Sequence, residues 1–558
     1  MSYNLQQESS RILQDVLLKD PLLELPESFA KAAEKVRFVG GDSQPFIPTP
    51  CKITESISAL NALLAVAASV VAKDRFGVDF QDIEVNTDIS TLFLMSIVLS
   101  TLKGKPTLED AIIKQEIAKG DLYLMQKPIH RQCTNVYQTK DGRWYHLHGS
   151  MNAKASMEMM GVPEQDVSNE EAKDIYSAKV AQWDSAEIER VANEDYKQAG
   201  VVCNKPEEFF ASEQGRIMGK EPLYTLKPLK ATKKPWPASP NSTRPLAGIR
   251  VIDYSRVIAA PVISKMLALL GAEVIKVTSS GLPDISITWV DLNAGKKDCD
   301  LNLKTDEGRV AFRELIASAD VLIDGYRPGV LERLGFSSAS LREINSSLIY
   351  VRENCYGFKG PLQGRSGWQQ ISDCLVGISW LQGEFLGLNE PVVPLLRKFG
   401  PVRVIAYAHR VQLTHRVANS DYQVGVTGAV AVIHALLERA NKDTTFDIDV
   451  SLTQYNIWYY RLGQYTREQQ DALRQRNQGL ELRHHDEMNS LIAKTHAALR
   501  ACRPDIFAHP EYFTSIPGNE WGVDGDINIL AAPMKLSRSV LKYDVPSGAR
   551  GRSEPRWA

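Results

Sequence analysis

The part of the sequence that most constrains the fold runs from residue 249 to 351, where short apolar runs alternate with amphipathic segments. The runs have the length and β-branched composition of buried strands. Between them lie segments with helical spacing, at 261–270 and 309–318. Such alternation builds a parallel sheet that binds ligands at the carboxyl ends of its strands. The expected strands are 249–253, 272–277, 320–324 and 348–351.

Length and charge narrow the possible functions. The chain has 558 residues, which is too long for one ordinary domain. With 65 basic and 67 acidic residues its formal net charge is -2, and 44% of its residues are hydrophobic. This is the composition of a globular protein with no nucleic-acid or membrane-surface signature. We therefore expect neither nucleic acid nor a membrane as a partner.

The sequence shows no secretory or peroxisomal targeting signal and no strong metal-binding motif. Residues 1–20 lack the charged start and apolar core of a secretory signal, and the C-terminus carries no peroxisomal signal. The longest apolar stretch, 57–72, is shorter than the ~20 residues of a membrane span. Seven scattered cysteines without CxxC spacing indicate reduced thiols, and the histidine pairs at 146/148 and 484/485 make weak metal candidates. The sequence thus predicts a cytoplasmic protein without a metal site.

A proline-rich linker divides the chain. The segment 227–245 contains five prolines and has no apolar periodicity, which is typical of a semi-rigid connection. Around it, four short patterns occur twice in the same order. They pair 59–64 with 431–437, 82–85 with 447–450, 205–210 with 509–513, and 224–229 with 527–533. We interpret this as a duplication in which the first copy lacks the strand–helix part after residue 245.

Six motifs follow one another in the part of the chain after the linker and together resemble the pattern of a known family. They are PLAGIRVIDYSRVIAAP from Pro245, LGAEVIKV from Leu270, NAGKKDCDLNLKTDEGR from Asn293, ADVLIDGYRPGVLERLGF from Ala319, VRENCYGFKGPLQGRSGW from Val351 and NSDYQVGVTGAVAVIHALLERA from Asn419. This pattern resembles the family III CoA-transferases, also called the CaiB/BaiF family. The resemblance implies an α/β fold, with a Rossmann-like parallel sheet as large domain, a smaller α/β domain, and pairing into a homodimer.

The resemblance also sets the expected domains. Residues 1–40 would be an N-terminal extension, 41–228 a degenerate partial copy of the family, and 229–245 the linker. Residues 246–558 would be the CoA-transferase domain. The stretch 397–418 interrupts the family pattern with five basic residues, two histidines and no acidic residue. It is either a basic flap that grips CoA phosphates or, as we favour, a translated intron.

The implied chemistry uses an acyl-CoA thioester as substrate, a small carboxylic acid as partner, and no bound cofactor. Family members employ an aspartate that attacks the thioester and then carries CoA as an aspartyl thioester. The matching residue is Asp421, within Asn-Ser-Asp, which also suits a helix N-cap. The two roles are compatible, because a helix dipole favours an ionised carboxylate at its start. The first-copy counterpart is Lys52, which cannot form an acyl anhydride, so that copy should be silent.

A second position separates reaction types within the family. Racemases of the family carry His-Asp where this chain has Trp368 and Gln369, and neither of these side chains titrates. The Gln369 amide can still donate a hydrogen bond to a thioester oxygen, so we predict a catalytic role for it.

For CoA binding, the resemblance implies a further set of residues. Cations near the strand ends suit the three phosphates of CoA. The chain departs from the family at Thr278 and in 279–290, which contains no arginine. The implied CoA-binding residues are Val257, Ile258, Lys296, Arg327 and Arg333.

The sequence therefore predicts CoA transfer between carboxylic acids through Asp421. Two alternatives stay open: racemisation, dehydration or another isomerisation of a CoA thioester, and a non-catalytic family member that acts as a binding subunit.

Overall fold

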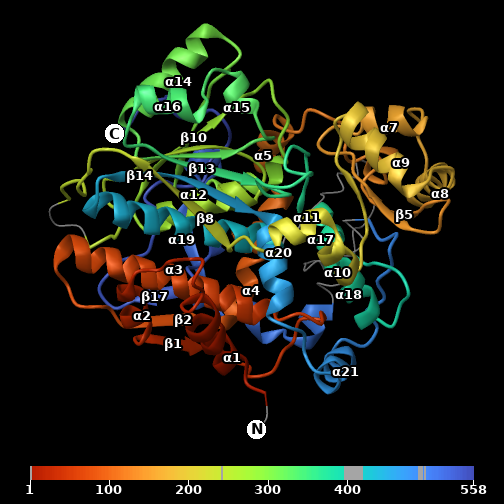
Figure 1. The fold of residues 1–558 in the computed structure, drawn as a ribbon, viewed down its shortest axis with the longest axis horizontal. Helices are drawn as coiled ribbons and strands as arrows, with labels where there is room; N and C mark the ends of the chain where they lie inside the picture. The colour runs from red at the N-terminus through yellow and green to blue at the C-terminus, as the bar shows by residue number, and fades with distance from the viewer. Residues whose placement is uncertain (1–2, 240–242, 395–418, 488–493, 495–497) are drawn as a thin grey trace.

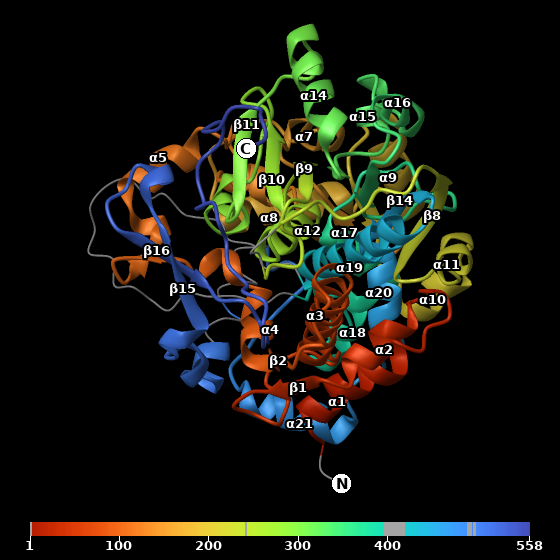
Figure 2. The same cartoon turned by 90° about the vertical axis from the view of Figure 1, so that its left-hand side faces the viewer.

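The computed structural model describes residues 3–239, 243–394, 419–487, 494 and 498–558 (Figure 1). The expected insertion at 397–418 lies outside the described residues. The chain folds into stacked layers of helices and sheets, which Figure 2 shows from the side.

The largest sheet confirms the Rossmann-like prediction. In the described part of the chain it has seven strands in the order β11-β10-β9-β12-β13-β14-β8. The first six are parallel, and β8 closes the edge in the antiparallel sense. The four predicted strands are present as β9, β10, β12 and β13. The bounds are β8 Tyr224–Lys230, β9 Arg250–Ser255, β10 Glu273–Thr278, β11 Lys296–Asp300, β12 Val321–Gly325, β13 Ile349–Asn354 and β14 Thr444–Ser451.

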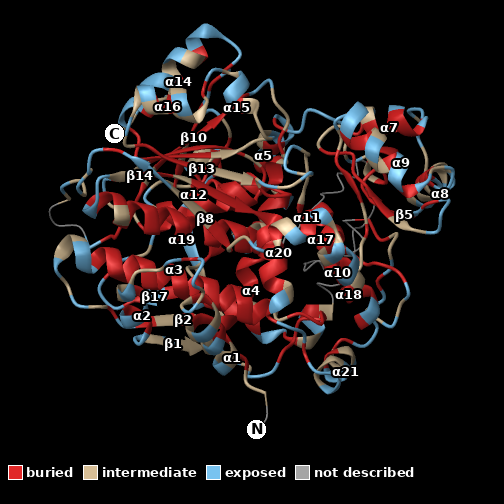
Figure 3. Ribbon diagram, in the orientation of Figure 1, coloured by how far each residue is buried: buried red, intermediate tan, exposed pale blue. Residues whose placement is uncertain are grey.

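Helices cover both faces of this sheet. On one face α14 (Asp306–Ser318) and α16 (Ser338–Ile344) pack on residues such as Ile252 and Ile275. On the other face α12 (Ala259–Leu269) and α19 (Asn419–Asn441) pack on Val251 and Ile323. The alternation of inward residues along β9 supplies both faces, as expected for a sheet buried on two sides. Figure 3 shows α12 and α19 buried along most of their lengths, whereas α14 and α16 expose one side.

A third layer comes from the N-terminal part of the chain. Helix α3 (Ile53–Phe76) lies against α19, and its other side packs on a small sheet of β1 (Val36–Val39), β2 (Ile83–Asn86) and β17 (Met534–Leu536). Among the described helices, α3 is the one long and apolar enough to cross a membrane, and it is longer than the stretch 57–72 suggested. Its apolar window is 100% buried inside the protein, as in a core helix.

The two parts of the chain exchange strands. Strand β8 begins before the predicted linker 227–245 and continues into it as far as Lys230, so the first residues of that segment pair in the sheet. It is antiparallel to β14, which follows the linker. Strand β17, near the C-terminus, pairs antiparallel with β2 of the N-terminal part. Both β14 and β2 also have a parallel neighbour, β13 and β1 respectively. The same three-strand arrangement therefore occurs twice, each time completed by the other part of the chain; the duplication itself stays a prediction.

Smaller units complete the molecule. A lobe at the upper right of Figure 1 contains the sheet β5 (Asn135–Gln138), β6 (Trp144–Leu147) and β7 (Gly200–Val202), covered by α7 (Lys154–Met160) and α8 (Asn169–Val180). Another sheet joins β3 (Thr101–Leu102) and β4 (Lys105–Pro106) to β15 (Phe513–Pro517) and β16 (Asp526–Leu530). These are the smaller α/β elements that the family resemblance implied.

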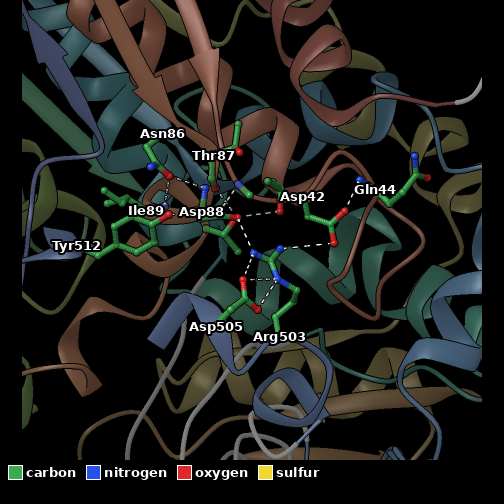
Figure 4. A network of polar contacts seen from close by, with 12 residues as sticks. Asp42, Gln44, Asn86, Thr87, Asp88, Ile89, Arg503, Asp505 and Tyr512 are labelled. Carbon is green, nitrogen blue, oxygen red and sulfur yellow. Dashed lines mark hydrogen bonds and ion pairs between the residues drawn. The ribbon is translucent and has the colours of Figure 1, made fainter. Parts of the chain in front are cut away.

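A buried arginine ties the C-terminal segment to the N-terminal part (Figure 4). The Arg503 side chain is 7% exposed, and its guanidinium lies 3.4 Å from the buried carboxylate of Asp88 and 3.6 Å from Asp42. It also donates to Asp505 at 2.7 Å. Asp88 follows the Asn86 side chain that caps α4 (Thr87–Phe93). The guanidinium thus compensates a carboxylate that water cannot reach.

We predict that Arg503→Ala lowers the free energy of unfolding by about 3 kcal/mol, because it leaves the Asp88 carboxylate buried without its counter-charge. Chemical denaturation followed by tryptophan fluorescence measures this. The control is Arg556→Ala, whose pair with Glu554 is exposed at both side chains, 79% and 71%. Equal stability of the two variants would show that the network contributes nothing.

Candidate active site

A cleft lies at the carboxyl ends of the parallel strands, where the sheet was expected to bind its ligand. Its cavity is about 110 Å³. The loops after β9, β12 and β13 form its walls, together with the segment 365–368 and the start of α19. Met151, from the N-terminal part, also lines it. Of the residues predicted from the sequence, the cleft brings together Val257, Ile258, Arg327 and Asp421.

Asp421 lies in the first turn of α19, and close helix packing sets its position. Gly425, four residues later, faces the start of α12: a Cβ there would come within 2.4 Å of Val262 and 2.8 Å of the Ala259 carbonyl oxygen. A Cβ at Gly428 would likewise come within 2.5 Å of the Ile263 side chain. Only glycine allows α19 to approach α12 this closely, and the approach places Asp421 beside the loop after β9.

Glu353 is a functional candidate that the sequence reasoning missed. It is the second-last residue of β13 and lines the cleft together with Asp421. Burial raises the pKa of Glu353 to about 8, and the negative charges of Asp421 and Asp324 add to the effect. Glu353 is therefore mainly protonated at neutral pH. Its position after the predicted strand 348–351, where ligands bind, was the available signal.

A second cavity, of about 390 Å³, adjoins the cleft. Arg256, Tyr326 and Arg327 line both spaces. The rings of Tyr254 and Tyr326 stack at 4.3 Å between centroids, and the guanidinium of Arg256 lies 4.7 Å from the Tyr326 ring. The predicted Arg333 lines this cavity. Aromatic faces next to several cations suit a ligand that carries both a base and phosphates.

Lys304 also lines the second cavity and was not singled out from the sequence. It follows β11 in the motif Leu301-Asn-Leu-Lys, so its place at a strand end was the missed signal. The loop 279–290, which contains no arginine of its own, is held by Arg550 from the C-terminal segment. Arg550 donates to the carbonyl oxygens of Ser279 at 2.9 Å and Leu282 at 3.1 Å.

The structure does not bring Lys296 to either cavity. Its side chain is fully buried, pairs with Asp253 at 2.9 Å and donates to the Pro261 carbonyl oxygen at 2.7 Å. Burial lowers the pKa of Lys296 to about 8. Burial opposes ionisation of Asp253, but the charges of Lys296 and Lys276 outweigh it and hold the pKa of Asp253 below its usual value. Lys296 thus stabilises the sheet interior.

Gln369 is not among the residues that line the cleft. It opens α17 (Gln369–Val376), is buried, and donates to Asp373 at 3.0 Å. Burial raises the pKa of Asp373 to about 7, although hydrogen bonds from Asn456 and Gln369 oppose the shift. Its neighbour Trp368 does line the cleft and stacks on His148 at 5.2 Å between centroids.

The weaker candidates have structural partners. Lys52, at the start of α3, pairs with Glu8 at 2.8 Å. The rings of His146 and His148 stack at 5.7 Å, and His484 lies 3.0 Å from Glu390. The described residues contain no group of three or more His, Cys, Asp or Glu side chains that could hold a metal.

Comparisons with known proteins agree with this architecture. Residues 246–489 match the model of CoA-transferase family III. The acetyl-coenzyme A transferase nodX of Hypoxylon pulicicidum is 35% identical over 97% of this chain and 91% of its own length. An acyl-CoA transferase of Gibberella moniliformis is 29% identical over 75% of this chain and 72% of its own. The beta subunit of the succinyl-CoA–L-malate CoA-transferase of Chloroflexus aurantiacus is 35% identical over 38% of this chain and 50% of its own.

The fold is α/β with a cleft at the carboxyl ends of its parallel strands, and the chain belongs to CoA-transferase family III. The class predicted from the sequence, a CoA-transferase enzyme of this family, is confirmed. The match to nodX covers 97% of this chain and therefore also includes the N-terminal part that contains α3.

Proposed function

We propose that the protein transfers CoA from an acyl-CoA to a small carboxylic acid and that Asp421 is the nucleophile. One observation carries the proposal: the cleft at the strand ends contains the Asp421 carboxylate at the start of a buried helix. The helix dipole keeps such a carboxylate ionised and ready to attack.

In the proposed reaction, the acyl group and CoA are bound covalently to Asp421 in turn. Its carboxylate attacks the thioester carbonyl, the C–S bond breaks, and CoA leaves as a thiolate. The thiolate then attacks the Asp421 carbonyl of the anhydride, which releases the donor acid and leaves an aspartyl-CoA thioester. The acceptor carboxylate attacks that thioester, the C–S bond breaks, and CoA thiolate leaves behind a second mixed anhydride between Asp421 and the acceptor. The thiolate then attacks the acceptor carbonyl of this anhydride, which forms the new acyl-CoA and releases the Asp421 carboxylate. CoA is thus a substrate, and no resident cofactor is required.

The second cavity is the proposed place for the nucleotide end of CoA. Arg327, Arg333 and Lys304 would neutralise the phosphates, and the apolar side chains of Val330 and Leu334 on the same wall would contact the base. Because this cavity and the cleft share Arg256, Tyr326 and Arg327 as lining residues, we propose that a ligand extends from one into the other. A homodimer remains a proposal that sedimentation can test.

We predict that Asp421→Asn retains the fold but lowers turnover by at least about three orders of magnitude, since an amide cannot form the anhydride. Steady-state CoA transfer across a panel of acyl-CoAs and acids measures this. The matched control is Asp471→Asn, at an exposed position on α21 (Arg467–Arg476), which should behave as wild type. Turnover by the Asp421→Asn variant, with deamidation excluded by mass, would remove Asp421 from the mechanism.

We predict that Arg333→Gln raises the Kd of CoA about tenfold, equivalent to about 1.4 kcal/mol, by removing a cation from the second cavity. Binding of pantetheine, which lacks the nucleotide phosphates, should stay unchanged. Isothermal titration measures both ligands. The control is Arg313→Gln, an exposed residue of α14 that stacks on Phe336. Equal losses for CoA and pantetheine would place the phosphates elsewhere.

A further inference from the structure

Glu353 occupies the wall between the cleft and a third cavity of about 530 Å³. Among the described residues that line the cleft, Glu353 and Asp421 are the carboxylates. They come from different elements, the end of β13 and the start of α19, and both face the space where a thioester would react. The fold therefore places a second acidic side chain beside the proposed nucleophile.

The charged groups around Glu353 do not favour its ionised form. Asp421 faces it from α19 and Asp324 from β12, and both raise its pKa. The nearby cations are directed to other partners within the described residues. Arg352 pairs with Asp449 at 2.7 Å, and Lys227 pairs with the same carboxylate. Arg365 pairs with Glu189 at 2.7 Å. Arg327 donates to the Lys197 carbonyl oxygen at 3.4 Å, and Arg256 donates to the Pro283 carbonyl oxygen.

Two carboxyl groups that line one cleft repel each other when both are ionised, which raises the pKa of one of them. The helix dipole of α19 favours the negative charge on Asp421. Glu353 has no such support, because it lies near the end of a strand and adjoins Asp324, whose own pKa burial raises to about 6. The proton therefore resides on Glu353 and leaves Asp421 as the nucleophile.

We propose that Glu353 is a catalytic residue whose carboxyl O–H donates a hydrogen bond to the substrate oxygen that gains negative charge when Asp421 attacks. The proton stays on Glu353 throughout: the thioester oxygen accepts the hydrogen bond as its charge grows and returns to a carbonyl when the C–S bond breaks. This inference rests on the proposed function, because it needs Asp421 as the attacking group. Placed donors of this kind are worth about two to three orders of magnitude in kcat.

The role has a pH signature. Because Glu353 ionises as the pH rises through about 8, the enzyme loses the donor and gains a repelling charge in the cleft. CoA transfer should therefore fall above about pH 8. Lys296, whose pKa burial also lowers to about 8, is a rival source of an alkaline decline, so variants must separate the two.

The test compares pH–rate profiles of wild type, Glu353→Gln and Glu353→Ala. The Gln side chain keeps an N–H donor and does not titrate, so we expect a rate within about threefold of wild type at pH 7 and no alkaline decline. We expect the Ala variant to lose about a hundredfold in kcat with little change in KM. Glu343→Gln, exposed on α16, is the control and should keep the wild-type profile. Circular dichroism and thermal melting confirm that each variant folds.

A readout independent of activity tests the protonation itself. Difference infrared spectroscopy should show a protonated carboxyl band that disappears as the pH rises through about 8 and is missing in Glu353→Gln. An unchanged alkaline decline in Glu353→Gln, or a loss as large as in Glu353→Ala, overturns the inference. If wild type transfers CoA in an Asp421-dependent manner, such a result refutes only the role of Glu353. If wild type transfers no CoA, or Asp421→Asn remains active, the proposed function fails and this role fails with it.

Discussion

The enclosure of α19 between α12 and α3 is the packing constraint on which the site depends. Gly425 and Gly428 allow α19 to lie against α12, while α3 from the N-terminal part covers its other side. This double contact fixes the first turn of α19, with Asp421, next to the loop that follows β9. The N-terminal part therefore contributes to the site by holding α19 in place. Lys52, the predicted counterpart of Asp421, pairs with Glu8.

The second cavity and the cleft differ in the charge of the side chains that line them. The second cavity collects Arg333, Lys304 and stacked tyrosines, which suit an anionic nucleotide. The cleft itself contains two carboxyl groups, Asp421 and Glu353, and burial together with the charge of Asp421 raises the pKa of Glu353 to about 8. The Asp421 carboxylate can then attack the thioester while the protonated Glu353 carboxyl donates a hydrogen bond to the thioester oxygen. Two ionised carboxylates could not provide both functions.

Sequence patterns were sufficient where burial is simple and local. The apolar runs identified β9, β10, β12 and β13 because parallel strands are buried on both faces. Strand β11 escaped detection because Lys296 is neutralised by Asp253 from another strand, a contact that no local pattern shows. The same ion pair holds the Lys296 side chain in the sheet interior, away from the residues that line the two cavities. The exchange of β8 and β17 between the two parts depends on pairing over hundreds of residues, so it required the structure.

The central claim is that CoA passes through a covalent bond to Asp421, and chemical trapping tests it most directly. The protein is incubated with acyl-CoA, treated with hydroxylamine or borohydride, digested, and mapped by mass spectrometry. The account predicts modification of the peptide at Asp421 that requires acyl-CoA. Modification at a different carboxylate, such as Glu353, or an unmodified Asp421 under conditions in which CoA is transferred, would contradict it.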